Sequence, residues 1–121
     1  MRRPRHRAAV ALAALALGGA APAPAQESQG VARGRRVYEE QCAVCHDPGA
    51  GHPGTELLML KRGPAFAVIR GRRDLPPVYI EAVVRNGLIE MPPFRPTDVS
   101  DADLAALVQF LRSADPSAPS Q

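Results

Sequence analysis

The sequence is poor in aromatic residues, which are the largest side chains of most protein cores. It has no tryptophan and only two tyrosines and three phenylalanines among 121 residues, although a small domain has little core to spare. No apolar run reaches the roughly 20 residues that a membrane-spanning helix needs, so no stable membrane anchor is expected. No convincing alternation of apolar and polar residues marks a β-strand. These absences favour a small all-α domain whose centre is filled by something other than aromatic side chains.

The chain beyond its first 25 residues has no excess of positive charge. Four of the fifteen basic residues fall within the first seven positions, ahead of the apolar residues 8–21 and the small-residue sequence Ala23-Pro24-Ala25. That order is typical of a secretory signal peptide, so residues 1–25 are predicted to be cleaved, and the absence of a cysteine there argues against a lipoprotein. The remainder has eleven basic and twelve acidic residues, a net charge of −1, which gives no reason to expect nucleic-acid binding.

The rest of the chain, residues 26–114, is predicted to form one domain of three to four helices. The first helix is expected over residues 31–41. Residues 42–54 are rich in Gly and Pro and are expected to be irregular. A short helix is then predicted to begin at Thr55 and to end before Gly63.

Two later helices are indicated by their end signals. Asp74 precedes Pro76-Pro77, an acceptor side chain followed by residues without an N–H group, so a helix should begin there and end at Gly87. Residues 100–103 resemble a capping box. Residues 115–121 form a Pro/Ser tail that is expected to be disordered. The last helix should bury a stripe at helical spacing that comprises Leu104, Leu107, Val108 and Leu111.

The two cysteines stand in the sequence Cys42-Ala43-Val44-Cys45-His46, which is the Cys-x-x-Cys-His signature of c-type haem attachment. Two thiols at this spacing add to the two vinyl groups of a porphyrin, and the adjacent imidazole then reaches the iron. The second nitrogen of that imidazole is expected to donate to a backbone carbonyl near Pro53 or Pro64. Attachment takes place outside the bacterial cytoplasm, so the motif and the signal peptide together predict a periplasmic protein with one covalent haem c.

Three other uses of these residues fit the sequence less well. A structural zinc site normally has four protein ligands, and only Cys42, Cys45, His46 and His52 are present, crowded into one loop. A thioredoxin-type pair follows a strand and opens a helix, whereas this pair follows a helical pattern. A disulfide between residues three apart would be strained and would close a very short loop.

The second axial iron ligand is predicted by elimination among His52, Met59 and Met91. Met59 lies in an apolar helical stretch and is expected to be a core side chain. His52 is too close to His46 along the chain to reach the opposite face of the haem, and it is expected to face solvent or to bond locally. Met91 lies in a Pro-rich loop where helix packing gives no reason for a methionine, so Met91 is the predicted ligand. A vacant or His-ligated iron remains the alternative.

Ligation by His46 and Met91 raises the reduction potential and leaves no open position for a substrate. The chain is therefore expected to transfer electrons and not to be an enzyme by itself. The group Arg70, Arg72 and Arg73 could neutralise the haem propionates, although a solvated loop explains these residues equally well.

With these residues the chain resembles class I cytochromes c. The marks are Gly34-x-x-x-Tyr38-x-x-x-Cys42-x-x-Cys45-His46, then Met91-Pro92, then Leu107-x-x-Phe110-Leu111, which together span about residues 30–112. The resemblance implies a small helical fold around one covalent haem c. It also implies that the first and last helices cross near Gly34, with an aromatic residue such as Phe110 at the contact. The short loop after His46 and the lack of tryptophan depart from the mitochondrial form and leave the propionate contacts open.

A narrower resemblance is to the cytochrome subunits of p-cresol methylhydroxylase and related 4-alkylphenol (eugenol-type) hydroxylases. It rests on the segments 45–55, Arg73-Asp74-Leu75-Pro76-Pro77, Val84-Arg85-Asn86-Gly87 and Met91-Pro92-Pro93-Phe94-Arg95. The resemblance implies an FAD-containing flavoprotein partner that oxidises a para-substituted phenol. The chain would then pass single electrons to a periplasmic acceptor such as a small copper protein.

Two other functions stay open. A free-diffusing carrier would connect a membrane reductase or quinoprotein dehydrogenase with a terminal oxidase. Such a carrier more often shows a ring of one charge sign, which a net charge of −1 does not indicate, whereas a tight subunit should present apolar surface, for which Pro92, Pro93, Phe94 and Ala43 are candidates. A haem-based sensor or peroxidase would need an open iron site.

Overall fold

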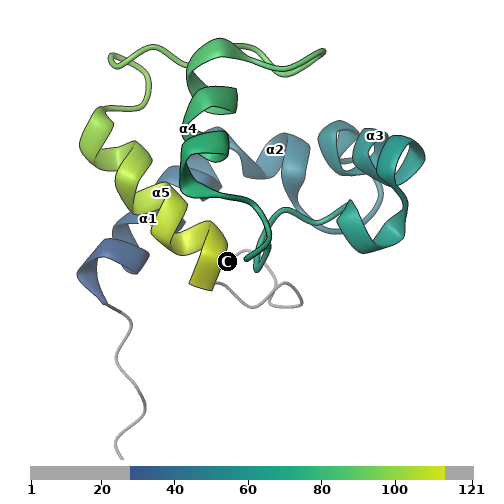
Figure 1. Cartoon of the computed structure of the whole chain (residues 1–121), viewed down its shortest axis with the longest axis horizontal. Helices are drawn as coiled ribbons and strands as arrows, with labels where there is room; N and C mark the ends of the chain where they lie inside the picture. The colour runs from purple at the N-terminus through teal and green to yellow at the C-terminus, as the bar shows by residue number, and fades with distance from the viewer. Residues whose placement is uncertain (1–27, 114–121) are drawn as a thin grey trace, which may run out of the picture.

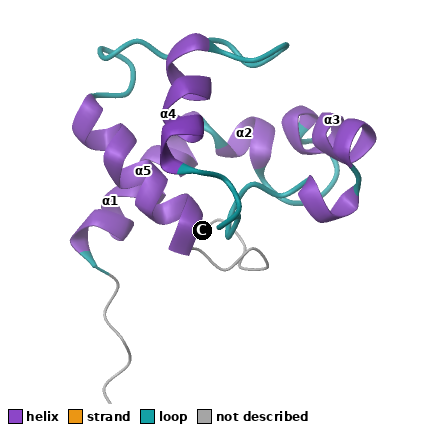
Figure 2. Ribbon diagram, in the orientation of Figure 1, coloured by secondary structure: helices purple, strands orange, loops and turns teal. Residues whose placement is uncertain are grey.

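The computed structural model describes residues 28–113, and these residues fold entirely as helices and loops (Figures 1 and 2). Five α-helices and one short 3-10 helix are present, and no strand is formed within this range. No helix among the described residues is long and apolar enough to cross a membrane. The all-α prediction is confirmed, with more helices than the three to four expected. The helices are α1 Gln29–Gln41, α2 Ala43–His46, α3 Pro53–Arg62, α4 Pro77–Asn86 and α5 Asp101–Ser113, and the 3-10 helix is Pro64–Phe66.

The first and last helices pack directly against each other, and Gly34 is the point of closest approach. A Cβ atom at Gly34 would lie 2.0 Å from the Ala106 carbonyl oxygen and 2.7 Å from the Phe110 Cβ. Only glycine therefore allows the two backbones to come this close. Beside this crossing the rings of Tyr38 and Phe110 meet with their centroids 5.4 Å apart, in the tilted arrangement that aromatic pairs favour.

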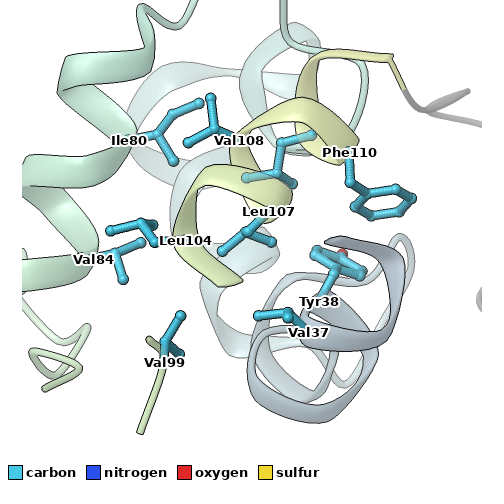
Figure 3. Close-up of a cluster of buried hydrophobic side chains, with 10 residues drawn as sticks. Val37, Tyr38, Ile80, Val84, Val99, Leu104, Leu107, Val108 and Phe110 are labelled. Atoms are coloured by element: carbon cyan, nitrogen blue, oxygen red, sulfur yellow. The ribbon is translucent and has the colours of Figure 1, made fainter. Parts of the chain in front are cut away.

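The hydrophobic core lies where α4 and α5 meet the last turns of α1 (Figure 3). The predicted stripe of α5 is buried at all four positions, with no side chain more than 7% exposed. Val99, in the loop before α5, is 2% exposed and completes the cluster from the side opposite Phe110. The other members are Val37, Tyr38, Ile80 and Val84.

Several helix ends follow the local signals in the sequence. Gly63 and Gly87 end α3 and α4 with φ angles of 93° and 74°, which favour glycine. Ser100 caps α5, because its hydroxyl oxygen accepts the Asp103 N–H at 3.1 Å and the hydroxyl donates to the Asp103 carboxylate at 2.6 Å. This is a capping box in which aspartate takes the place of glutamate.

Residues 42–54 are more regular than predicted. The one-turn helix α2 continues after a bend at Cys42, where the His46 N–H donates to the Cys42 carbonyl at 2.9 Å. Helix α3 begins at Pro53 and not at Thr55, because proline suits the first helical turn. The Thr55 hydroxyl does not cap the helix and instead donates to the Asp47 carbonyl at 2.9 Å.

Helix α4 also begins without the predicted cap. Pro76 occupies the N-cap position and makes no side-chain hydrogen bond there. The Asp74 carboxylate binds Arg72 at 2.7 Å instead, because the guanidinium two residues earlier offers a paired, charge-assisted contact. The predicted signal peptide, residues 1–25, and the predicted tail, residues 115–121, lie outside the described residues.

Candidate functional site

The Cys-x-x-Cys-His motif forms the bend between α1 and α2. The Cys42 N–H ends α1 by donating to the Tyr38 carbonyl at 2.8 Å, and Cys45 and His46 follow on the single turn of α2. Both thiols are free. Burial, and secondarily the neighbouring Cys45, raise the pKa of the Cys42 thiol to about 12. A thiol-disulfide catalyst needs a lowered pKa, so this environment is unlike that of a redox-active pair.

The imidazole of His46 is held against the N-terminus of α3. A Cβ atom at Gly54 would lie 2.7 Å from the ring carbon Cε1 and 2.9 Å from Nδ1, so the ring packs against a residue that must lack a side chain. Burial lowers the pKa of His46, which favours the neutral imidazole that binds metals. The expected acceptor near Pro53 or Pro64 is not found: Nδ1 is buried and has no hydrogen-bond partner among the described residues. Because α3 begins at Pro53, Gly54 in its first turn lies against Nδ1, where the acceptor was expected.

The backbone of His46 is fixed by Tyr38, a role that the sequence analysis did not assign. The Tyr38 hydroxyl donates to the His46 carbonyl at 2.9 Å and lies 3.0 Å from the Asp47 carboxylate. Burial, and then the bond to Asp47, raise the pKa of the Tyr38 hydroxyl, so it stays protonated and remains a donor. The signal in the sequence is the spacing of four residues between Tyr38 and Cys42, which places Tyr38 on the face of the first helix that leads into the motif.

Met91 lies close to the Cys-x-x-Cys-His motif in space although it is far from the motif in the sequence. Met91 and Cys42 line one small apolar pocket with Gln41, Val84, Phe94, Val99 and Leu107. The structure thus brings the predicted distal ligand together with the first cysteine of the motif. Met91 stands at the end of a tight turn in which the Leu88 N–H donates to the Met91 carbonyl at 3.0 Å and the Met91 N–H to the Leu88 carbonyl at 2.9 Å.

The two other ligand candidates lie elsewhere. The expectation that Met59 is a core side chain is wrong, since it is 49% exposed on α3; the apolar run around it does not face the core of α4 and α5. His52 bonds locally, as expected, with Nδ1 3.2 Å from the Val44 carbonyl oxygen. Among the described residues no group of three or more His, Cys, Asp or Glu side chains is arranged to hold a metal ion.

The three arginines after α3 differ sharply in their surroundings. Arg70 is 1% exposed and lies over the Tyr38 ring, 5.6 Å from the centroid, and its Nε and Nη2 atoms have no hydrogen-bond partner among the described residues. Arg72 is paired with Asp74, and Arg73 is exposed and reaches the Arg112 carbonyl. Two unpaired nitrogens on a buried guanidinium are costly, so Arg70 alone of the three is suited to bind an anionic group.

Several large apolar side chains of the described residues are exposed, and some of them are close in sequence to the motif or to Met91. Of the predicted patch, Pro92 and Pro93 are exposed, whereas Ala43 and Phe94 are partly buried against the core. Exposed apolar surface on this scale indicates that something covers it, and a flat apolar cofactor would do so. The large exposed apolar side chains are Val44, Met59, Leu60, Phe66, Val78, Tyr79, Leu88 and Ile89.

Comparison with known proteins gives consistent matches. The family described as cytochrome C oxidase, cbb3-type, subunit III matches residues 29–111. The cytochrome c subunit of 4-cresol dehydrogenase [hydroxylating] from Pseudomonas putida is 35% identical over 80 residues, which are 66% of this chain and 58% of that protein. The chain thus matches less than two thirds of that relative's length.

Two crystal structures of p-cresol methylhydroxylase, one of them with substrate bound, contain a similar chain. Each is 33% identical to this one, with a TM-score of 0.50 over 68% of this chain. The match covers 92% and 93% of the two solved chains. The similarity therefore extends over nearly the whole of a solved domain.

Proposed function

Because the chain belongs to the cytochrome c family, as the resemblance indicated, we propose that it is an electron-transfer protein that carries single electrons on one covalently bound haem c. We further propose that it acts in the periplasm as the electron-accepting subunit of a phenol-oxidising flavoprotein. The observation that carries the first proposal is the position of Met91 beside Cys42 of the Cys-x-x-Cys-His motif. When bound, the haem supplies an iron that gains or loses one electron at a time.

Cys42, Cys45 and His46 are the proposed attachment residues. The residues fit the group: both thiols are free, one bounds an apolar pocket, and the His46 imidazole, whose pKa burial lowers, packs against Gly54 while Tyr38 holds its backbone. Packing on Gly54 sets the orientation of the ring, and the Tyr38 bond sets the backbone from which it projects. Two contacts within the chain therefore orient the proposed proximal ligand.

Met91 is the proposed distal ligand, and a pair of methionine variants tests it. In the ferric holoprotein, Met91→Ala is expected to abolish the weak far-red absorption band and to lower the reduction potential, because methionine ligation raises it. Met59→Ala removes the other candidate thioether and is expected to leave both unchanged. An unaltered spectrum in Met91→Ala would assign the position to another ligand.

Arg70 is the proposed partner of a haem propionate. It is the one member of the basic group 70–73 that combines burial with unpaired guanidinium nitrogens, and Arg–carboxylate pairs are strong when water is excluded. Arg72 and Arg73 have protein partners at the surface, so neither is needed for this contact.

The flavoprotein partner is supported by the similarity to a 4-cresol dehydrogenase cytochrome subunit and by the exposed Pro92 and Pro93 beside Met91. Rigid apolar residues at the rim of a redox site suit a lasting interface better than a charged ring does. Electrons would leave to a periplasmic acceptor such as a small copper protein.

The test of this proposal is affinity purification of the tagged holoprotein from its native periplasm. A co-purifying protein with bound flavin in stoichiometric amount would support the subunit, and para-alkylphenols would be its first substrates to test. A haem protein that elutes alone would favour the free-diffusing carrier. The second result would leave the assignment of the haem ligands intact, because the methionine variants decide that separately.

A further inference from the structure

The segment that carries Met91, residues 88–99, has no regular secondary structure to hold it. It runs from the end of α4 to the start of α5 at the top of Figure 1. Its first turn contains Ile89 with a φ of 54°, the one positive value for a non-glycine residue in the described chain. This conformation is unfavourable for a β-branched side chain and persists only where neighbouring contacts maintain it. Contacts from outside the segment are therefore needed to fix Met91.

The backbone provides one of these contacts. The Phe94 N–H donates to the Val84 carbonyl at 2.8 Å, which joins the segment to α4. At Gly87 a Cβ atom would lie 2.6 Å from the Met91 carbonyl oxygen, so the end of α4 also lies directly against the Met91 backbone. Both of these backbone contacts join the segment to α4 and neither joins it to α5.

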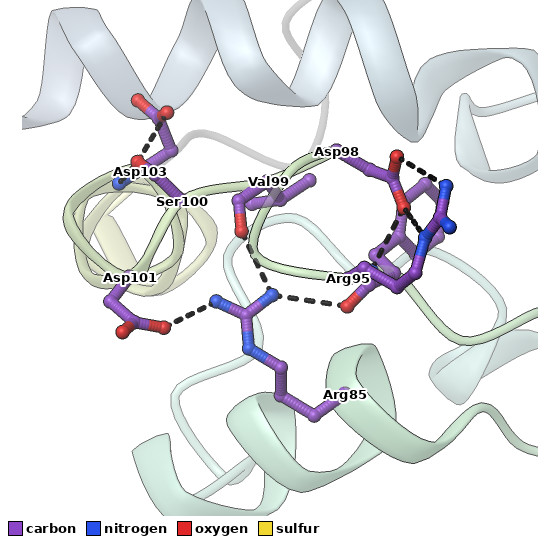
Figure 4. A network of polar contacts seen from close by, with 8 residues as sticks. Arg85, Arg95, Asp98, Val99, Ser100, Asp101 and Asp103 are labelled. Atoms are coloured by element: carbon purple, nitrogen blue, oxygen red, sulfur yellow. Dashed lines mark hydrogen bonds and ion pairs between the residues drawn. The ribbon is translucent and has the colours of Figure 1, made fainter.

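Arg85 adds polar contacts to the segment through a single guanidinium group (Figure 4). Its Nη1 donates to the Phe94 carbonyl at 3.1 Å and to the Val99 carbonyl at 2.8 Å. Its Nη2 binds the Asp101 carboxylate at 2.7 Å, at the first turn of α5. One side chain on α4 therefore holds both ends of the loop that follows Met91 and connects that loop with α5.

We propose that Arg85 is a positioning residue that keeps the Met91 sulfur in place as the distal ligand; this inference rests on the proposed role of Met91. The two carbonyl bonds carry the effect. The Arg85 side chain is 22% exposed, so these bonds are largely shielded from water, whereas the Asp101 side chain is 88% exposed and such an ion pair contributes little. Arginine is required because its planar group donates in several directions at once, which an ammonium on a flexible stem does not reproduce.

The test uses the ferric holoprotein and the rate at which added imidazole displaces the distal ligand. Arg85→Met keeps the apolar stem and removes the donors. It is expected to weaken the far-red band and to raise the rate of imidazole binding about tenfold or more, the ratio that corresponds to the loss of a charge-assisted hydrogen bond. Arg85→Lys is expected to fall between this variant and the wild type, and it serves if Arg85→Met does not accumulate.

Two matched controls separate the effect of the two carbonyl bonds from the effects of charge and of general stability. Arg95→Ala removes another arginine of the same segment, but one that is 79% exposed and pairs only with the nearby Asp98. Asp101→Asn removes the ion pair and leaves both carbonyl bonds. Both controls are expected to bind imidazole at the wild-type rate.

The outcomes distinguish this inference from the proposed ligand. If Arg85→Met and Arg85→Lys bind imidazole no faster than Arg95→Ala, while Met91→Ala loses the far-red band, the positioning role is wrong and the ligand stands. If Met91→Ala keeps the band, the ligand assignment fails and the role of Arg85 fails with it. Faster binding in both Arg85 variants but in neither control supports the proposal.

Discussion

The hydroxyl of Tyr38 and the backbone carbonyl of His46 are joined by a 2.9 Å hydrogen bond that connects the first helix of the domain to the proposed proximal ligand. The same hydroxyl lies 3.0 Å from the Asp47 carboxylate. Tyr38 has no exposed surface, so water cannot replace it as a donor. The contact therefore serves stability and ligand orientation together.

Tyr38→Phe is expected to destabilise the holoprotein by about 1–2 kcal/mol, since it leaves a buried acceptor without its donor while preserving the ring packing. Denaturant unfolding followed by the haem absorption would measure this change. Tyr79→Phe removes a hydroxyl from a side chain that is 45% exposed and should leave the free energy of unfolding unchanged. Equal effects of the two substitutions would show that the His46 contact contributes nothing.

The two glycines on α1 allow a matched test of the helix crossing. At Gly34 an added Cβ would lie 2.0 Å from the backbone oxygen of Ala106, whereas at Gly30 it would meet only the end of the flexible Gln109 side chain. Gly34→Ala is therefore expected to cost about 3 kcal/mol or to prevent folding. Gly30→Ala should be neutral or stabilising by up to about 1 kcal/mol, because alanine favours the helix. Comparable melting temperatures for the two variants would contradict the close approach at Gly34.

The capping box of α5 predicts a particular pH dependence. The Ser100 hydroxyl, and secondarily Arg33, hold the pKa of Asp103 below its ordinary value of 3.8. A carboxylate whose pKa is lower in the folded state contributes stability above its unfolded pKa and loses that contribution as the pH falls through the folded pKa. Asp103→Asn should therefore melt below the wild type at pH 7, and this difference should disappear at acidic pH.

Ser100→Ala provides the companion measurement for this cap. It removes the main cause of the lowered pKa and leaves Arg33, 2.7 Å from Asp103, in place. The variant also loses the cap bond from the Asp103 N–H, which does not depend on pH, so it should melt below the wild type at both pH values, by less at acidic pH than at pH 7. A difference between wild type and Asp103→Asn that stays constant with pH would mean that the carboxylate charge is not involved.

Arg70 should affect the redox equilibrium. A buried positive charge disfavours the oxidised iron, which carries one charge more than the reduced iron. Arg70→Met is therefore expected to lower the reduction potential and to reduce the yield of haem-loaded protein. Arg72→Met, which alters an arginine paired with Asp74 and stacked on Phe66 at the surface, should change neither. A potential that responds equally to both variants would point to a general electrostatic effect.

Features with local causes could be predicted from the sequence. The ends of α3 and α4 at Gly63 and Gly87 and the cap at Ser100 each depend on a few adjacent residues, and each is found in the structure. Met91 is the predicted distal ligand because helix packing gives no reason for a methionine in a Pro-rich loop. The structure places it beside Cys42, and its role as a ligand stays a prediction.

The features that were missed depend on distant or competing contacts. Thr55 looks like a helix cap in sequence, yet its hydroxyl bonds Asp47, and Asp74 turns to Arg72. Nothing local separates Arg70 from its basic neighbours, because only the fold buries it against Tyr38. The contacts of Arg85 with Phe94 and Val99 likewise exist only once α4, the Met91 segment and α5 are assembled.

The packing of α1 on α5 also constrains when the domain can form during synthesis. Gly34 meets residues 106 and 110, so the first helix cannot form its main packing contact until the last one has been made. Such long-range pairing delays closure of the core relative to local helix formation. A chain growing from its N-terminus therefore presents Cys42 and Cys45 in an open form well before the surrounding structure closes. Because the predicted signal peptide implies export, and c-type haem is attached outside the cytoplasm, slow pairing of α1 with α5 after export would keep both thiols accessible for attachment until the core closes.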